Sequence, residues 1–174
     1  MRNALYADGG VIGGNPSEIG GTWAWRHVGL DGEINSGSGV IAPREAGLAV
    51  VTNNLTEMLA VLKGLQALPD GWQGVVYSDS NVTLGRVFRG WKWANIPTWV
   101  HDLYRQQVER LAWSSIDFVL LAGHPTAAQL AAGTGRHGYP VSEHNVWCDK
   151  ACRRAGEHFL AEMETRTVKG LVPA

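Results

Sequence analysis

The sequence predicts an α/β fold: a five-stranded mixed sheet, its first three strands antiparallel and the rest parallel, flanked by helices. Segments typical of strands fill about the first forty residues, with no helical pattern between them. After Asn54, segments with helical spacing alternate with short apolar strands. Such alternation implies right-handed crossovers and parallel pairing. The length of 174 residues suits one domain.

Three strands are expected in the N-terminal part. Residues 4–8 are mostly apolar and precede Gly9-Gly10, so we expect the first strand to end at this pair. A second strand is predicted over 21–28, where Trp alternates with other side chains. The turn residues Asp31-Gly32 then reverse the chain into a third strand over 33–41.

The remaining chain predicts four helices and two strands. Apolar residues at helical spacing predict a helix over 55–68 with Asn54 as its N-cap, and its inner face carries Leu55, Met58, Leu59, Leu62 and Leu65. The other elements expected are a strand over 74–78, helices over 80–88 and 97–111, a strand over 116–121 and a helix over 143–163. We interpret residues 1–164 as one domain with an insert at 125–144, followed by a loose C-terminal tail over 165–174.

Composition narrows the classes of partner. The formal net charge is −1, so a nucleic acid would have to be held by a local basic patch. The two cysteines, Cys148 and Cys152, do not form a disulfide framework. The N-terminus has no apolar leader and no segment approaches a membrane span, so we expect a cytoplasmic protein without a membrane partner.

Four acidic residues are expected to converge at one edge of the sheet. Asp8 ends the first strand and Asp79 ends the fourth, so the two become neighbours if these strands are adjacent. A helix packed on the sheet brings Glu57 over them, and Asp149 near the start of the last helix closes the group. Each acid alone has a structural interpretation, as a turn residue, a helix cap or a first-turn acid.

Grouped carboxylates predict a divalent metal site. Packed carboxylates raise one another's pKa, so a cluster that is ionised near neutral pH needs a cation. Hard oxygen ligands suit Mg²⁺, with Mn²⁺ as an alternative. Two such ions about 3.5–4 Å apart activate a water and stabilise the leaving oxygen in phosphoryl displacement. A nucleic acid is the substrate this chemistry suggests.

The residues around these acids resemble the type 1 ribonuclease H family over about residues 4–161. The similarity rests on five motifs in the family's order. They are Leu5-Tyr6-Ala7-Asp8-Gly9-Gly10 with Gly14-Asn15-Pro16, then Thr52-Asn53-Asn54-Leu55-Thr56-Glu57, Tyr77-Ser78-Asp79-Ser80-Asn81, Gly123-His124, and Asn145-Val146-Trp147-Cys148-Asp149.

The resemblance implies a ribonuclease H-like fold and an endonuclease that cuts the RNA strand of RNA/DNA hybrids, leaving 3′-hydroxyl and 5′-phosphate ends. Asp8, Glu57, Asp79 and Asp149 would bind two Mg²⁺ ions, and His124 would assist proton transfer or product departure. Asn15, Asn53 and Asn81 would contact the minor groove, where the 2′-hydroxyl distinguishes RNA from DNA, and Thr52 would hold a DNA-strand phosphate. We expect a monomer.

Three features depart from the family pattern. About twenty residues separate His124 from Asn145, where relatives have a few. Leu55 stands where Arg is frequent, which weakens the expected phosphate pocket. The segment after residue 88 is only modestly basic and mixes cations with tryptophans. A nucleic-acid surface and an amphipathic helix with core tryptophans both fit the residues involved, which are Arg86, Arg89, Trp91, Lys92 and Trp93.

Two further patterns and two rival functions stay open. The run Gly133–Gly138 has dinucleotide-binding spacing but follows no strand, so we interpret it as a flexible loop. A zinc site is a minority hypothesis against free buried thiols, and its ligands would be His144, Cys148, Cys152 and His137. The rival functions are a nuclease of this fold acting on DNA or junctions, and a non-catalytic hybrid-binding domain.

Overall fold

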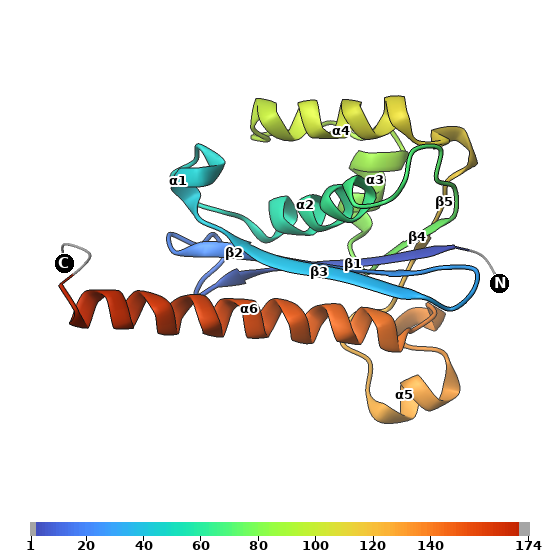
Figure 1. The fold of residues 1–174 in the computed structure, drawn as a ribbon. Helices are drawn as coiled ribbons and strands as arrows, with labels where there is room; N and C mark the ends of the chain where they lie inside the picture. Colours follow the sequence, from blue (N-terminus) through green and yellow to red (C-terminus); the bar gives the residue numbers. More distant parts are fainter. Residues whose placement is uncertain (1–2, 171–174) are drawn as a thin grey trace.

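The computed structural model describes residues 3–170, which form a five-stranded sheet in the order β3-β2-β1-β4-β5 (Figure 1). Pairs β1–β2 and β2–β3 are antiparallel, and pairs β1–β4 and β4–β5 are parallel. The predicted fold class is therefore confirmed. The strands are β1 (Ala4–Ile12), β2 (Gly20–Val28), β3 (Ile34–Ile41), β4 (Val75–Ser78) and β5 (Asp117–Leu120).

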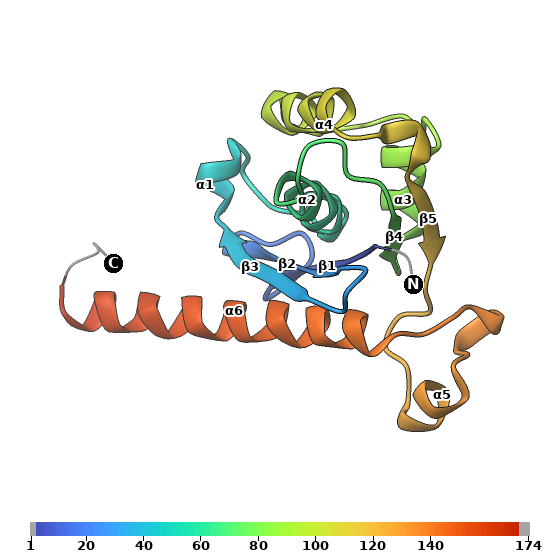
Figure 2. The same cartoon turned by 45° about the vertical axis from the view of Figure 1, so that its right-hand side comes forward.

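Helices cover both faces of the sheet (Figures 1 and 2). One face carries α2 (Asn53–Gln66), α3 (Asn81–Phe88) and α4 (Thr98–Arg110). The other face carries α6 (Glu143–Val168), with α5 (Ala127–Ala132) near its N-terminal end. The remaining elements are α1 (Pro43–Ala46) and two short 3₁₀ turns, η1 (Trp113–Ser115) and η2 (Arg136–Gly138). Among the described residues, no helix is both long and apolar enough to span a membrane.

The main core lies between the sheet and α2. Leu5 and Ala7 of β1 point into this layer and are fully buried. The predicted apolar face of α2 is confirmed, because its five residues, Leu55, Met58, Leu59, Leu62 and Leu65, are all buried in this core. A smaller cluster between the sheet and α6 consists of Ala24, Cys148, Ala151 and Cys152. The α2 and α6 layers hold β1 from both sides.

Three predicted boundaries are wrong. β1 continues through Gly9-Gly10 to Ile12, because its pairing with β2 is unbroken across the glycines. Helix α2 begins two residues earlier than expected, and its N-cap is Thr52 instead of Asn54. The Oγ1 atom of Thr52 accepts a hydrogen bond from the Leu55 amide at 3.2 Å. α6 runs to Val168, so residues 165–168 are helical; residues 171–174 of the expected tail lie outside the described range.

Part of the insert is also regular. α5 begins with a capping box. The side chain of Thr126 accepts a hydrogen bond from the backbone amide of Gln129, and the side chain of Gln129 accepts one from the backbone amide of Thr126. The helix ends at Gly133, which has φ 74°. Thr126-x-x-Gln129 followed by Gly133 is the sequence signal that would have predicted this helix. The Gly133–Gly138 run is a turn that follows α5, so it lacks the strand that a dinucleotide site requires.

Candidate active site

Asp8 and Asp79 are neighbours because β1 and β4 are adjacent and parallel. Their register pairs Tyr6 with Tyr77, whose rings stack with centroids 4.7 Å apart. Asp8 lies two residues after Tyr6 on β1, and Asp79 lies two residues after Tyr77, immediately after the end of β4. The predicted meeting of these two acids therefore follows from the strand order and register.

Gly9 allows the N-terminal part of α2 to lie directly on β1. A Cβ atom at Gly9 would lie 2.3 Å from the backbone nitrogen of Glu57 and 2.3 Å from the carbonyl carbon of Thr56. No side chain fits there without displacing helix backbone. The absence of a side chain at Gly9 thus brings Glu57 beside Asp8.

We expect Gly9→Ala to destabilise the protein by about 1–3 kcal/mol, since backbone atoms of α2 must move to admit the methyl group. Denaturant unfolding measures this change. Gly14→Ala is the matched control, because the nearest atom to a Cβ there is 3.8 Å away. Equal unfolding free energies for the two variants would contradict the close-approach argument.

The carboxylates of Asp8, Glu57 and Asp79 form a compact cluster. One oxygen of each lies within 4.8 Å of one oxygen of each of the others. Within residues 3–170, no other group of three or more His, Cys, Asp or Glu side chains lies close enough together to share a metal ion. Three of the four predicted metal ligands are therefore brought together.

Asp149 and His124 lie at the rim of this cluster. They line a cavity of about 200 Å³ together with Asp79, Pro125, Asn145 and Val146. Asp149 is close enough to raise the pKa of both Asp8 and Asp79, and the charge of His124 lowers the pKa of Asp79. His124 itself is exposed and has φ 48°, an uncommon conformation for a non-glycine residue.

The electrostatics of the cluster favour a bound cation. Burial raises the pKa of Asp8 well above its ordinary value, and Asp79, Asp149 and Glu57 raise it further. Burial is also the main cause that raises the pKa of Glu57 and of Asp79. The buried Asp8 and the half-buried Glu57 and Asp79 thus resist ionisation without a positive charge among them.

A chain of hydrogen bonds holds Glu57. The side chain of Asn53 donates to Glu57 Oε1 at 2.8 Å, and the backbone nitrogen of Asn53 donates to Asn15 Oδ1 at 3.1 Å. Hydrogen bonds from Ser80 and Asn53 lower the pKa of Glu57 and so favour its ionised form. Asn15 and Asn53, which we expected to contact substrate, therefore also connect the loop after β1 to Glu57.

The donor set fits a hard divalent cation. All three clustered groups are carboxylates, the ligands Mg²⁺ and Mn²⁺ prefer. In addition, Asn145 is buried and its Oδ1 has no hydrogen-bond partner, while the residue lines the same cavity as Asp79 and Asp149. An unpaired buried carbonyl is costly unless a ligand or water satisfies it. Asn145 is a site residue that the sequence analysis did not single out.

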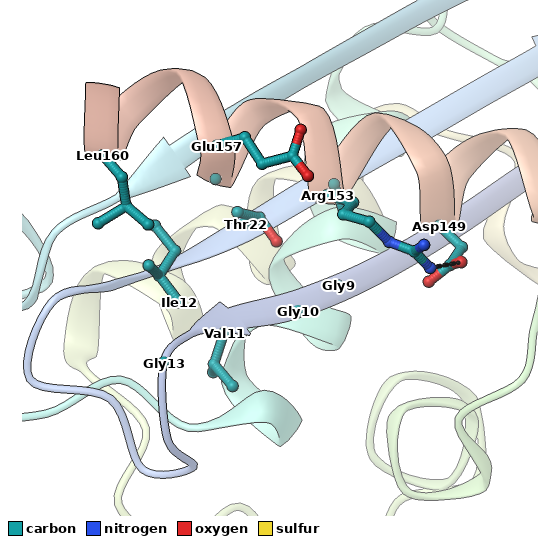
Figure 3. Close-up of a pocket in the computed structure, with 12 residues that line it drawn as sticks. Gly9, Gly10, Val11, Ile12, Gly13, Thr22, Asp149, Arg153, Glu157 and Leu160 are labelled. Carbon is teal, nitrogen blue, oxygen red and sulfur yellow. Dashed lines mark hydrogen bonds and ion pairs between the residues drawn. The ribbon is translucent and has the colours of Figure 1, made fainter. Parts of the chain in front are cut away.

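A second cavity, of about 310 Å³, lies between the C-terminal half of β1 and α6 (Figure 3). Arg153 donates to Asp149 Oδ2 at 3.0 Å at one end of this cavity, and the cavity floor is formed by Gly9, Gly10 and Thr22. The side chain of Arg153 is 67% exposed, so the pair is a weak surface interaction. The bond between Arg153 and Asp149 can therefore be exchanged for another partner of Asp149 at low cost.

Of the residues predicted to bind nucleic acid, Asn15, Thr52 and Asn53 lie near the start of α2, and the others lie on or just after α3. The exposed Asn81 accepts a hydrogen bond from Arg89 at 2.9 Å, and Lys92 and the 43% exposed Trp91 lie in the loop beyond. Trp93 packs against the core: its Nε1 donates to the Arg86 carbonyl at 2.9 Å. The core interpretation thus accounts for Trp93, while the other side chains remain candidates. Leu55, where the resemblance led us to expect Arg, is buried.

The thiols proposed as zinc ligands point into the protein. Cys148 donates to the Tyr6 carbonyl at 3.6 Å and Cys152 to the Asp8 carbonyl at 3.3 Å. Burial is the main cause that raises the pKa of Cys152 to about 12, and it raises that of Cys148 as well. Across the described residues, no thiol joins a metal-like cluster, so the free-thiol interpretation fits better.

Comparison with known proteins gives relatives of one kind. The protein named Ribonuclease H in Nitratidesulfovibrio vulgaris (strain DP4) is 31% identical over 130 residues, covering 69% of this chain and 76% of its own length. The Ribonuclease H of Prosthecochloris aestuarii is 25% identical over 161 residues, covering 87% of this chain and 92% of its own. No family model matches the chain.

Solved structures share the fold. LC11-RNase H1, determined in complex with an RNA/DNA hybrid, superposes with a TM-score of 0.60 at 19% identity, covering 91% of this chain and 99% of that one. RNase H1 from the halophilic archaeon Halobacterium salinarum NRC-1 gives a TM-score of 0.59 at 18% identity, with coverages of 91% and 99%.

Proposed function

Since the chain belongs to the ribonuclease H family, we propose that it is an endonuclease that hydrolyses the RNA strand of RNA/DNA hybrids with divalent metal ions. The observation that carries this proposal is the cluster of Asp8, Glu57 and Asp79, whose carboxylate oxygens lie within 4.8 Å of one another. The solved relative LC11-RNase H1 binds the same class of substrate, an RNA/DNA hybrid.

In this proposal the four acids Asp8, Glu57, Asp79 and Asp149 hold two Mg²⁺ ions, or Mn²⁺ instead. Bound there, the ions supply an activated water and stabilise charge on the leaving oxygen. Asn145 lines the cavity beside Asp79, and its side chain hydrogen-bonds Asp79, so it would hold that carboxylate in place for the metal. The products are a 3′-hydroxyl and a 5′-phosphate.

The protein's own groups position the substrate and move protons. His124, exposed beside Asp79, exchanges a proton with the leaving oxygen or assists product departure. The amides of Asn15, Asn53 and Asn81 contact the minor groove and identify the 2′-hydroxyl. The hydroxyl of Thr52 accepts from the Leu55 amide and keeps its proton free to donate to a DNA-strand phosphate.

The direct test uses an RNA/DNA hybrid with an end-labelled RNA strand, in Mg²⁺ and separately in Mn²⁺. We expect internal RNA cuts with 3′-hydroxyl ends, and no cuts in double-stranded RNA or DNA of the same sequence. Absence of hybrid cleavage with both metals would refute the proposal. Cleavage of branched DNA in its place would identify a DNA-directed nuclease, and tight hybrid binding without turnover would identify a binding domain.

A further inference from the structure

The insert returns to the site after leaving it. Its first part leads away from His124 into α5, and its second part comes back to β5 and the N-terminus of α6 (Figure 2). The returning segment is held by a hydrogen bond from the Ala122 amide to the Pro140 carbonyl at 2.9 Å. A bridge between Thr134 and Pro140 and a bond from the Gly135 amide to the Tyr139 carbonyl, at 2.8 Å, close the turn between them.

The closed turn, residues 136–139, is held close to the metal-site carboxylates by direct packing. A Cβ on Gly135 would lie 2.6 Å from the Cβ of Ala122. The next residue, Gly123, is so close to Asp79 that a Cβ there would lie 2.7 Å from Asp79 Oδ2. Arg136 follows Gly135 directly, with its Cα about 3.8 Å away. Two small residues, Ala122 and Gly123, therefore lie between the base of this turn and the catalytic carboxylate.

The part of the insert before α6, residues 125–142, carries one formal positive charge, and Glu143 at the start of α6 adds a negative one. Residues 125–142 contain no Asp or Glu, and Arg136 is their one Lys or Arg. In the full sequence, by contrast, 16 acidic residues outnumber 15 Lys and Arg. The net charge of this protein does not attract a polyanionic substrate, so the substrate must be held by local positive charge. Arg136 supplies such a charge near the carboxylate cluster.

The side chains of the turn are available to a ligand. Arg136, His137 and Tyr139 are exposed, Tyr139 by 43%. Over residues 3–170, the guanidinium of Arg136 has no ion pair or side-chain hydrogen bond, whereas Arg89, Arg110 and Arg153 each bond another side chain. His137 has φ 57°, between Gly133 and Gly138, which also have positive φ. These conformations fold the turn back tightly and leave its side chains exposed.

From these observations we propose that the 136–139 turn binds the sugar–phosphate backbone of the substrate next to the metal site. The guanidinium of Arg136 contacts a phosphate, and the ring of Tyr139 packs on a sugar or base. The loop between α3 and α4 lies on the α2 side of the sheet, and α5 of the insert lies on the α6 side (Figure 1). Residues 91 and 92 belong to that loop. The substrate would thus be held from both sides of the carboxylates. This inference rests on the proposed function and adds a substrate-binding role for the insert.

The test measures binding of a labelled RNA/DNA hybrid to an Asp79→Asn protein, which is expected to bind without cutting, over 50–200 mM salt. Adding Arg136→Ala should weaken binding roughly fivefold to tenfold at low salt. It should also reduce the slope of log affinity against log salt by about 1, because one phosphate contact is lost. The matched control is Arg166→Ala, an exposed arginine near the far end of α6, which should change neither quantity.

Two further measurements separate contact from structure. In the otherwise unchanged enzyme, Arg136→Ala should raise KM with kcat retained, as expected for loss of a binding contact. Tyr139→Phe should bind like the parent and Tyr139→Ala more weakly, since the ring rather than the hydroxyl is used. Unchanged affinity and salt slope in Arg136→Ala, in a parent that binds hybrid, would overturn this inference alone. A wild type that neither binds nor cleaves hybrid would overturn the proposed function and this inference together.

Discussion

Asp79→Asn is expected to lower the rate of RNA/DNA hybrid cleavage by about a thousandfold or more. The swap is nearly isosteric but removes one negative charge from a cluster whose oxygens lie within 4.8 Å of one another. Loss of a ligand charge weakens metal binding and the stabilisation of the leaving oxygen, which is worth several kcal/mol. Since about 1.4 kcal/mol corresponds to a factor of ten, a loss of three decades is the expected scale.

The fold should survive this substitution. Burial, and to a lesser degree the nearby Asp149, raises the pKa of Asp79, so a neutral amide is easier to accommodate there than a carboxylate. Single-turnover cleavage assays and circular dichroism measure the two effects separately. Asp102→Asn, on the exposed surface of α4, is the matched control and should leave the cleavage rate unchanged. Cleavage by the Asp79→Asn protein at more than a tenth of the wild-type rate would exclude Asp79 from the metal site.

The parts of the site that the sequence predicted are those fixed by strand order. Asp8 and Asp79 each follow an apolar strand, and a parallel pair of strands brings such positions to one edge of a sheet. Glu57 follows from the placement of α2 over that edge, although its helix begins earlier than expected. These relations depend on periodicity and topology, which are visible in a linear pattern.

The parts that could not be predicted depend on contacts between distant segments. Gly9 looks like a strand end in the sequence, yet it is a paired strand residue whose missing side chain admits α2. The bond from the Asn53 amide to Asn15 joins residues 38 positions apart. Such contacts follow from packing between α2 and β1, and no local pattern encodes them.

The insert likewise combines a local feature that the sequence could predict with a distant contact that it could not. The Thr126–Gln129 capping box is local and could have predicted α5. The packing of Gly135 on Ala122 is not local, and it is this contact that places the start of the 136–139 turn against the segment that precedes His124. The position of a long insert relative to an active site thus depends on a few close approaches of small residues.

Metal-free protein is expected to lose stability as pH rises, and divalent cations should reverse the loss. Burial, then Asp79, Asp149 and Glu57, raises the pKa of Asp8 well above its ordinary value. Below the unfolded pKa of about 3.9, Asp8 is protonated in both states and costs nothing. As pH rises toward and through the elevated folded pKa, the unfolded state ionises more readily, so the free energy of unfolding falls.

A cation bound among the carboxylates offsets this effect by mass action. Mg²⁺ at about 100 times its dissociation constant adds about 2.7 kcal/mol to the free energy of unfolding. For a domain of 174 residues this corresponds to a rise in Tm of about 5–10 °C. Thermal unfolding with EDTA and with Mg²⁺, from pH 5 to pH 8, measures both effects.

The Asp8→Asn variant tests whether Asp8, and not another titrating group, causes the loss of stability at high pH and its reversal by Mg²⁺. Its amide does not ionise, so the variant should be more stable than wild type in EDTA at pH 8 and gain little from Mg²⁺. The difference between variant and wild type should shrink as pH falls through the elevated folded pKa of Asp8, because Asp8 then becomes protonated and neutral in the wild type. Asp102→Asn should follow wild type throughout. An equal Mg²⁺-dependent rise in Tm for wild type and Asp8→Asn would place the stabilising cation elsewhere, and Asp8 would then be a buried acid without a metal.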